Sequence, residues 1–287
     1  MECGIDFNVI LSFALRSQLA YIIHPQAWHL TERIGWRPPG THHIYIQEAP
    51  KSEVNVVVEV DPIQKIQWIA VRGSSNFKNW ILNFRYMQRR FSKNFMDHRV
   101  VIDLHTGFYI AADDVYTDIL PHLQQNYRTH LTGHSLGGAI AVILMMFLKE
   151  DGYHVEQCIT FGQPKITDRK GADMCQHLPL VRVIHHEDIV PLLPPRTLRT
   201  QLQGGYHHFG AEIILEHETG FHYNPHSTVA KMSTSEFWRS LWRAIAQSNL
   251  KSSLEPLQDH DLSFYLSGIL QNLKSDASYS HKLTTVF

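Results

Sequence analysis

Residues 133–138 read GHSLGG and hold a serine whose surroundings suit a nucleophile. The stretch that ends at Thr132 can finish a strand, and the apolar stretch at 139–148 is a strong helix former. The glycines permit a tight turn that a side chain would block, so Ser135 would stand at the tip of the turn, beside the free amide groups of a helix N-terminus. G-x-S-x-G between a strand and a helix is typical of the nucleophile elbow of serine hydrolases.

A serine hydroxyl needs a histidine to take its proton and an acid to orient that histidine. In this kind of fold the expected chain order is serine, acid, histidine, with the later partners on loops. Asp188 fits the acid, because residues 181–184 read as a strand and Asp188 follows in a loop. His260 ranks first as the base, because it stands just before a helical pattern. Four weaker alternatives for the base stay open: His207, His208, His226 and His281.

Acyl transfer also needs N–H donors for the oxyanion that forms in the transition state. The amide of Leu136, directly after the serine, supplies one by its position. A second donor should come from a loop at the end of another strand. Residues 72–75 (RGSS) follow a strand pattern that ends at Val71, and Ser74 can add its hydroxyl.

The elements that must position these residues alternate between strands and helices. The expected strands are 54–60, 66–71, 155–161, 180–186 and 211–215, and the expected helices are 5–24, 107–125, 235–247 and 259–274. This alternation predicts an α/β domain layered around a largely parallel sheet. No repeat, low-complexity tract or long linker divides the pattern, so we expect a single domain over residues 1–287, with an amphipathic helix at about 5–24.

Composition narrows the class of protein. A net charge of −1 over 287 residues gives no reason to expect a nucleic-acid partner, and no apolar run is long enough for a transmembrane segment. Three cysteines form no disulfide framework, although a single bridge stays open. The 20 histidines come without an HExxH or CxxC motif, so we expect no metal and no cofactor. The acidic start, MECGID, is unlike a secretory leader and predicts a cytoplasmic protein, with export by a route lacking a cleaved leader left open.

From about residue 66 to about residue 266 the chain resembles the class 3, fungal-type lipases of the α/β-hydrolase superfamily. The matching segments are VRGSS at 71–75, HTGF at 105–108, TGHSLGGA at 132–139, TFGQP at 160–164, DIVP at 188–191 and LPP at 193–195. His260, followed by Leu262 and Tyr265, resembles the closing histidine segment of the family. The resemblance implies an α/β-hydrolase fold with a mostly parallel central sheet flanked by helices. It also implies a catalytic triad of Ser135, Asp188 and His260. The oxyanion hole would be formed by Ser74 and Leu136.

The resemblance further implies a short lid helix at about 77–84. Its apolar face, at helical spacing, would consist of Phe77, Trp80, Ile81 and Phe84. Such a face would cover the serine when closed and present apolar surface to lipid when open. An ordinary surface helix packed on the core is the alternative. The chain departs from the family at 165–168, which read KITD in place of a Val-Gly-Asn-like continuation, and in lacking the leader and disulfides of the secreted members. These departures argue against a secreted, fat-digesting role.

Together these patterns predict a serine carboxylic-ester hydrolase that acts on acyl lipids, similar to a triacylglycerol lipase, through an acyl-enzyme intermediate. Its partners would be an acyl-lipid or ester substrate and, transiently, a lipid surface. Two alternatives stay open. One is a phospholipase A or an acyltransferase with the same triad. The other is an inactive lipase-like binding scaffold, for which a broken triad would be the signature.

Overall fold

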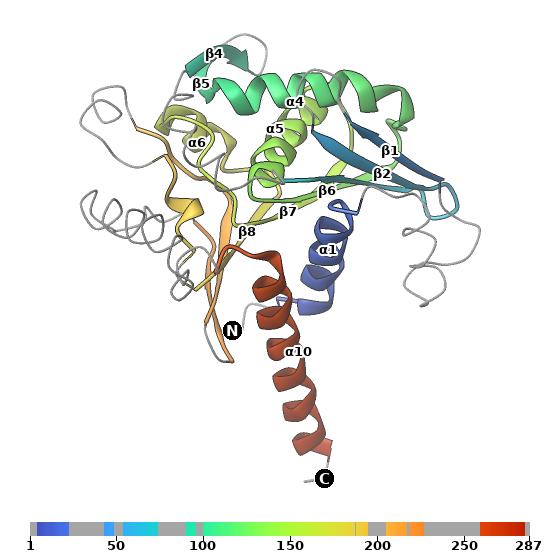
Figure 1. Cartoon of the computed structure of the whole chain (residues 1–287), viewed down its shortest axis with the longest axis vertical. Helices are drawn as coiled ribbons and strands as arrows, with labels where there is room; N and C mark the ends of the chain where they lie inside the picture. Colours follow the sequence, from blue (N-terminus) through green and yellow to red (C-terminus); the bar gives the residue numbers. More distant parts are fainter. Residues whose placement is uncertain are drawn as a thin grey trace, which may run out of the picture.

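An eight-stranded sheet with helices on both faces forms the centre of the computed structural model (Figure 1). The structure describes residues 5–22, 43–48, 54–73, 90–95, 100–186, 188–194, 205–216, 219–226 and 259–284. The strands of the sheet are β1 (His43–Glu48), β2 (Asn55–Asp61), β3 (Ile66–Val71), β6 (Arg128–His134), β7 (Val155–Phe161), β8 (Leu180–His185), β9 (Ala211–Leu215) and β10 (Phe221–Asn224).

The strand order is β1-β2-β3-β6-β7-β8-β9-β10. The five strands from β3 to β9 in this order run parallel to their neighbours, and antiparallel pairs add β1 and β2 at one edge and β10 at the other. Parallel strands end at the same edge of a sheet, so the loops after β3, β6, β7 and β8 meet there. The largely parallel sheet expected from the sequence is confirmed.

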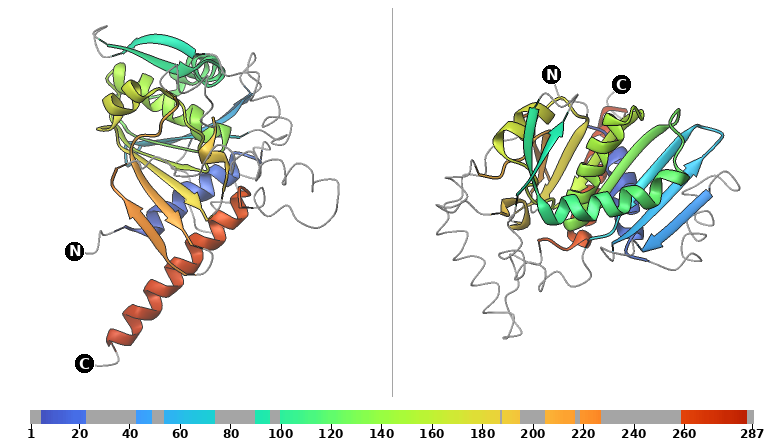
Figure 2. Two further views of the ribbon diagram at one scale, coloured as in Figure 1. Left: turned by 90° about the vertical axis from the view of Figure 1, so that its left-hand side faces the viewer. Right: turned by 90° about the horizontal axis from the view of Figure 1, so that it is seen from above.

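Helices cover the two faces of the sheet in separate groups (Figure 1; Figure 2). One face carries α4 (Thr106–Ile119), α5 (Leu136–Glu150) and α6 (Arg169–Cys175), and the other carries α1 (Phe7–Leu19) and α10 (Leu262–Thr284). Two short 3₁₀ turns, η1 (Leu120–His122) and η2 (Val190–Leu192), and a separate two-stranded ribbon of β4 (Arg90–Phe95) and β5 (Val100–His105) complete the described elements.

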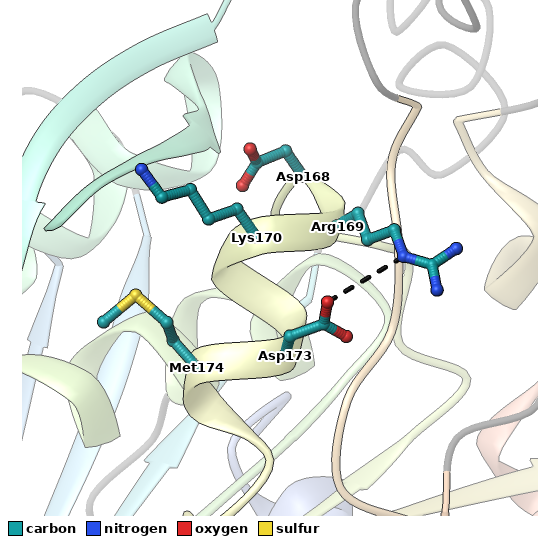
Figure 3. Close-up of a pocket in the computed structure, with 5 residues that line it drawn as sticks. All are labelled: Asp168, Arg169, Lys170, Asp173 and Met174. Carbon is teal, nitrogen blue, oxygen red and sulfur yellow. Dashed lines mark ion pairs between the residues drawn. The ribbon is translucent and has the colours of Figure 1, made fainter.

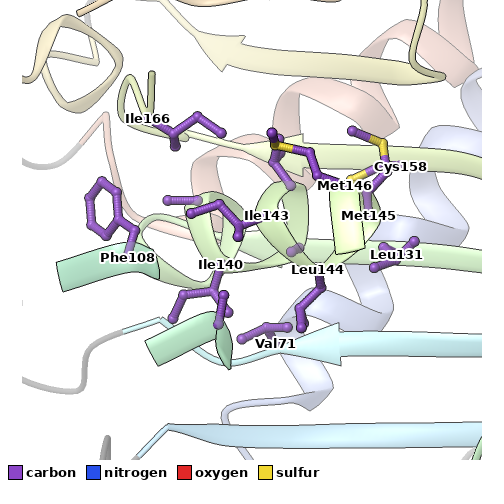
Figure 4. Packing of buried hydrophobic residues seen from close by; sticks show 14 of the residues in the cluster. Val71, Phe108, Leu131, Ile140, Ile143, Leu144, Met145, Met146, Cys158 and Ile166 are labelled. Atoms are coloured by element: carbon purple, nitrogen blue, oxygen red, sulfur yellow. The ribbon is translucent and has the colours of Figure 1, made fainter. Parts of the chain in front are cut away.

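The apolar core follows this division into faces. Helix α5 is apolar on nearly every side and is buried from Gly137 through Leu148, as expected for a helix held between a sheet and another helix. Its Ile140 and Leu144 lie in one cluster with Val71 of β3 and Phe108 of α4 (Figure 4). A second cluster, on the opposite face, joins apolar side chains of α1 and α10 to the sheet: Phe7, Phe13, Phe161, Tyr265 and Ile269.

Polar contacts fix α1 onto the sheet. The Arg16 guanidinium makes two hydrogen bonds to the buried Glu59 carboxylate, at 3.2 and 3.3 Å, and lies 3.8 Å from the centre of the Trp68 ring. The Ser17 hydroxyl lies 2.7 Å from the Thr132 hydroxyl of β6. Buried polar groups and charges are costly unless they are paired, so these contacts specify one seat for the helix. Tyr21, which follows α1, is thereby held close to His134 at the end of β6.

Most predicted elements lie close to their expected positions. The helix expected at 259–274 begins at Leu262, and the one expected at 107–125 ends in η1. The helix expected at 235–247 and the lid at 77–84 lie outside the described residues, and the single domain over 1–287 stays a prediction. No element was predicted at β1, β4, β5, β10 or α6. Polar residues interrupt β4 (RFSKNF) and β10 (FHYN), so pairing with a neighbour defines these strands more than their own pattern does. No helix in the described part of the chain has the length and apolar character to cross a membrane.

Candidate active site

Ser135 stands in the turn between β6 and α5. Its backbone has φ 58° and ψ −128°, a conformation that non-glycine residues rarely adopt and that costs about 1–3 kcal/mol. Its N–H donates to the carbonyl oxygen of Phe161 at 2.9 Å, which ties the turn to the end of β7. The side chain is buried, and its hydroxyl has no hydrogen-bond partner among the described residues. The serine is therefore held at a strained tip, and its hydroxyl is not engaged in a structural contact.

Two glycines allow this turn to lie close to its neighbours. A Cβ on Gly133 would stand 2.4 Å from the backbone of Gly137, and one on Gly137 would stand 2.2 Å from the carbonyl oxygen of Val71. Both distances are too short for a carbon atom, so only glycine fits. The N-terminus of α5 consequently lies against the end of β3. Leu136 opens this helix, so its amide is one of the first-turn donors that have no acceptor within the helix.

Asp188 and His260 form a buried hydrogen-bonded pair. Asp188 follows β8 and precedes η2, and His260 precedes α10. The His260 Nδ1 lies 2.7 Å from Asp188 Oδ2, and neither side chain is more than 3% exposed. An ionised carboxylate can only accept, so the proton is on Nδ1, and Nε2 is the nitrogen that can take a second proton.

Two further donors hold the Asp188 carboxylate. The Tyr265 hydroxyl donates to Oδ2 at 2.5 Å, and the Val190 amide donates to Oδ1 at 2.8 Å. Burial, and then the negative charge of Asp188, raise the pKa of Tyr265 well above its ordinary value, so this hydroxyl stays protonated and remains a donor. The acid is thus fixed by its own loop and by α10, the helix that follows the histidine.

Gly162 lies between the serine turn and this pair. Its φ is +57°, and a Cβ there would stand 2.8 Å from both Asp188 Oδ2 and His260 Nδ1. The residue before it, Phe161, accepts the hydrogen bond from the Ser135 amide. Ser135 and the Asp188–His260 pair therefore both lie beside the glycine turn that follows β7.

His134 provides a second link between the serine turn and His260. Its Nε2 lies 2.7 Å from the His260 carbonyl oxygen, its Nδ1 lies 2.8 Å from the Tyr21 hydroxyl, and the two imidazole centres are 4.5 Å apart. Burial is the main reason why the pKa of His134 falls from 6.5 to about 3. Burial also raises the pKa of Tyr21 above its ordinary value. Both side chains are therefore neutral at ordinary pH.

The structure brings Ser135, Leu136, Asp188 and His260 into one region. Ser74, Phe77, Trp80, Ile81 and Phe84 lie outside the described residues. In the contacts described, no hydrogen bond joins Asp188 to His207, His208 or His226. His208 bonds through Nε2 to the Pro191 carbonyl at 2.7 Å, the His207 amide bonds to the Thr167 carbonyl, and His226 is exposed. His281 lies roughly 28 Å along α10 from its first residue, at 1.5 Å per residue.

Sequence reasoning assigned no function to Tyr21, His134, Lys165 or Tyr265, although all four make contacts around the site. His134 lies inside the GHSLGG motif and Tyr265 lies shortly after His260, so proximity in the chain was an available signal for these two. Tyr21 and Lys165 depend on contacts with residues far away in the sequence. No local pattern indicates such contacts.

An open hollow of about 570 Å³ lies at α6 (Figure 3). Its lining residues are Asp168, Arg169, Lys170, Asp173 and Met174. Arg169 and Asp173 form an ion pair at 3.8 Å between two largely exposed side chains. None of the five lining residues bonds to the serine turn or to the acid–histidine pair in the contacts described. In the described ranges, no group of three or more histidine, cysteine or acidic side chains is arranged to hold a metal ion.

Comparisons with known proteins find similar sequences and a similar fold among lipases. Residues 68–198 match the family model for class 3 lipases. The chain is 30% identical over 181 residues to a secreted mono- and diacylglycerol lipase of Fusarium solani, which covers 58% of this chain and 49% of that protein. It is 25% identical over 228 residues to a lipase of Rhizopus niveus, covering 75% of this chain and 55% of that protein. The chain thus spans about half the length of the curated relatives it matches. Lipase II from Rhizopus niveus shares the fold, with a TM-score of 0.67, 22% identity and coverage of 88% of this chain and 92% of that one.

The cytoplasmic location predicted from the sequence is wrong. The relative from Fusarium solani is named as a secreted protein, which contradicts that prediction. The two cysteines that the structure describes give no information about location. Cys158 and Cys175 are free thiols buried in the core. Burial raises the pKa of the Cys175 thiol from 9.0 to about 12 and raises that of Cys158 as well. A buried, protonated thiol is unreactive in an oxidising or a reducing environment, so these cysteines do not report a compartment.

Proposed function

We propose that this chain is a carboxylic-ester hydrolase of the class 3 lipase type that acts on acyl lipids, because residues 68–198 match that family model and a mono- and diacylglycerol lipase is 30% identical to the chain. The observation that carries the proposal is the 2.7 Å hydrogen bond between His260 and Asp188, next to a serine in a strained turn. A serine, a histidine with its proton on Nδ1 and a buried carboxylate are the parts that acyl transfer requires.

In the proposed reaction the Ser135 hydroxyl attacks the ester carbonyl while His260 Nε2 takes its proton. His260 then gives that proton to the leaving alcohol, and an acyl-enzyme remains. Water, activated by the same nitrogen, adds to the acyl-enzyme, and the fatty acid leaves as Ser135 regains its proton. Asp188 keeps His260 in the required tautomer and stabilises the imidazolium that forms twice in each cycle.

The oxyanion of each tetrahedral intermediate would accept hydrogen bonds from the Leu136 amide and from Ser74. Leu136 supports this role because it opens α5, where first-turn amides have no helical acceptor and the helix dipole favours negative charge. Ser74 is the next residue after Gly73 in the sequence, three positions beyond the end of β3. Removing one oxyanion donor in such sites typically costs about 10²–10³-fold in kcat.

We assign glycerides as the substrate class, because the Fusarium solani relative is named for monoacylglycerol and diacylglycerol. A panel of triacylglycerol, diacylglycerol, monoacylglycerol and phosphatidylcholine, with product analysis by mass spectrometry, tests this assignment. Fatty acid release from glycerides well above that from phosphatidylcholine supports it. Preferential cleavage of the phospholipid, or transfer of the acyl group to an added alcohol in place of water, would replace it with one of the alternatives.

The reaction itself is tested with Ser135→Ala. Hydrolysis of p-nitrophenyl butyrate should fall by roughly 10⁴-fold or more, because a buried nucleophile has no substitute. A fluorophosphonate should label the wild type and leave the variant unlabelled. Ser12→Ala, a serine variant on the surface of α1, is the matched control and should retain both properties. Full activity or labelling in Ser135→Ala would exclude the mechanism.

A further inference from the structure

A chain of hydrogen bonds runs from α1 to the backbone of the proposed catalytic histidine. The Tyr21 hydroxyl, just beyond the end of α1, lies 2.8 Å from His134 Nδ1. His134 Nε2 lies 2.7 Å from the His260 carbonyl oxygen. Gly73, in the loop after β3, packs closely against the Tyr21 oxygen. Three segments that are far apart in the sequence are thereby connected through two side chains.

The direction of each bond in this chain follows from its chemistry. A carbonyl oxygen can only accept, so His134 Nε2 carries the hydrogen and donates to His260. A neutral imidazole has one N–H, so Nδ1 is an acceptor and the Tyr21 hydroxyl must donate to it. Because burial lowers the pKa of His134 to about 3 and raises that of Tyr21, neither group changes charge near neutral pH, and the directions persist.

The Tyr21 hydroxyl is tightly packed against Gly73. A Cβ on Gly73 would stand 2.3 Å from this oxygen and 2.7 Å from the His134 carbonyl oxygen, so a larger residue at position 73 would displace the hydroxyl. The Arg16–Glu59 pair and the Ser17–Thr132 contact hold α1 in place on the sheet.

We infer that Tyr21 and His134 are positioning residues. They hold the backbone of His260 at a fixed position relative to the Ser135 turn and the loop after β3. This inference rests on the proposed function of Ser135, Asp188 and His260. Asp188 holds the His260 ring through Nδ1, and His134 holds the same residue through its carbonyl oxygen. Two restraints on opposite ends of one residue fix where Nε2 can lie, which a single hydrogen bond to the ring would not do.

The test compares Tyr21→Phe with Ser17→Ala. Each variant removes one hydroxyl from the α1 segment and one hydrogen bond to β6, but only Tyr21 is linked to His134. We expect kcat for p-nitrophenyl butyrate to fall about tenfold in Tyr21→Phe, with KM changed less than about twofold. Ser17→Ala should keep kcat within about twofold of wild type. The melting temperatures of both variants should fall by similar amounts. An equal loss of kcat in both variants would show that Tyr21 acts only through folding, and it would overturn the inference.

A second measurement does not depend on turnover. Nitrogen-15 NMR of the histidine side chains should give His134 a protonated Nε2 and an unprotonated Nδ1 from pH 5 to pH 9, with the resonance assigned by its absence in His134→Gln. In Tyr21→Phe the Nδ1 signal should shift, because its donor is lost. A proton on Nδ1 in the wild type would contradict the direction derived above. If the wild type hydrolysed no ester while this tautomer was observed, the proposed function would fail and the hydrogen-bond chain would stand.

Discussion

Replacing Gly162 with alanine is a sharp test of the geometry around His260. The glycine has φ +57°, and a Cβ at this position points at the hydrogen bond between His260 and Asp188. The substitution adds one methyl group and removes no functional atom. A loss of kcat beyond the effect of backbone strain must therefore come from displacement of the pair.

The size of the effect can be worked from the contact distances. A methyl carbon would stand 2.8 Å from Asp188 Oδ2 and from His260 Nδ1, whereas ordinary contacts begin at 3.4 Å, so the pair must move by about 0.6 Å. A misplacement of 1 Å can cost about 10²-fold in rate, so we expect kcat to fall roughly 10- to 100-fold. Alanine at positive φ adds about 1–2 kcal/mol of strain, which lowers the melting temperature by several degrees in a chain of this size.

The assay measures kcat for a soluble ester, the rate of fluorophosphonate labelling and the melting temperature. Gly210→Ala is the matched control, because its φ is +77° and its Cβ would stand 2.6 Å from the Leu180 carbonyl oxygen, among residues that make no contact with the pair. It should lose as much stability as Gly162→Ala while keeping kcat. Wild-type kcat in Gly162→Ala would refute the reasoning, and so would an equal loss of kcat in the two variants.

Two further outcomes follow from buried groups. Burial lowers the pKa of three histidines from 6.5 to about 3 or 4, so they are neutral when folded and take up protons on unfolding below pH 6.5; they are His105, His130 and His134. The free energy of unfolding should therefore be steady above about pH 7. Between pH 6.5 and pH 4 it should fall by up to about 1.4 kcal/mol per pH unit for each of these histidines. Urea unfolding at a series of pH values measures this free energy, and a value that did not change with pH would contradict the prediction. Lys165 donates through Nζ to two carbonyl oxygens of the loop after Asp188, at 2.7 and 3.3 Å. Lys165→Met should therefore lower the free energy of unfolding by about 2–4 kcal/mol and lower kcat. The control Lys170→Met, at an exposed lysine, should change neither the melting temperature nor the rate of ester hydrolysis.

The sequence was most informative where one element could be recognised from its own residues. The apolar run of α5 and the β-branched runs of β2 and β3 define these elements without outside help. The turn at Ser135 follows from glycines on both sides of the serine. The strands β4 and β10 were missed because alternate polar residues weaken their own signal, and the neighbouring strands supply the pairing that defines them.

The candidate site was predictable to the extent that its members lie in recognisable segments. Asp188 was identified from the strand before it, and His260 from the helix after it. Their hydrogen bond joins residues 72 positions apart, so the choice of His260 over the other histidines rested on position and resemblance, and only coordinates show the contact. The contact of Lys165 with the loop after Asp188 could not be predicted either, because it joins residues 27 and 29 positions apart. At Lys165 the sequence showed only a departure from the family pattern. A buried lysine that bonds to carbonyl groups has no local signature.

The neutrality of His134 connects the fold to the proposed chemistry. Its ring centre is 4.5 Å from that of His260, which in the proposed reaction becomes an imidazolium during each proton transfer. A second positive charge at that distance would oppose the transfer by roughly 4 kcal/mol at an effective dielectric constant of about 20, close to a thousandfold in rate. Because burial lowers the pKa of His134 to about 3, His134 is neutral at ordinary pH and this repulsion is absent. The same burial keeps Nε2 of His134 as a donor to the His260 backbone. The neutral His134 side chain thus restrains the backbone of His260 and does not repel the imidazolium that Asp188 would stabilise.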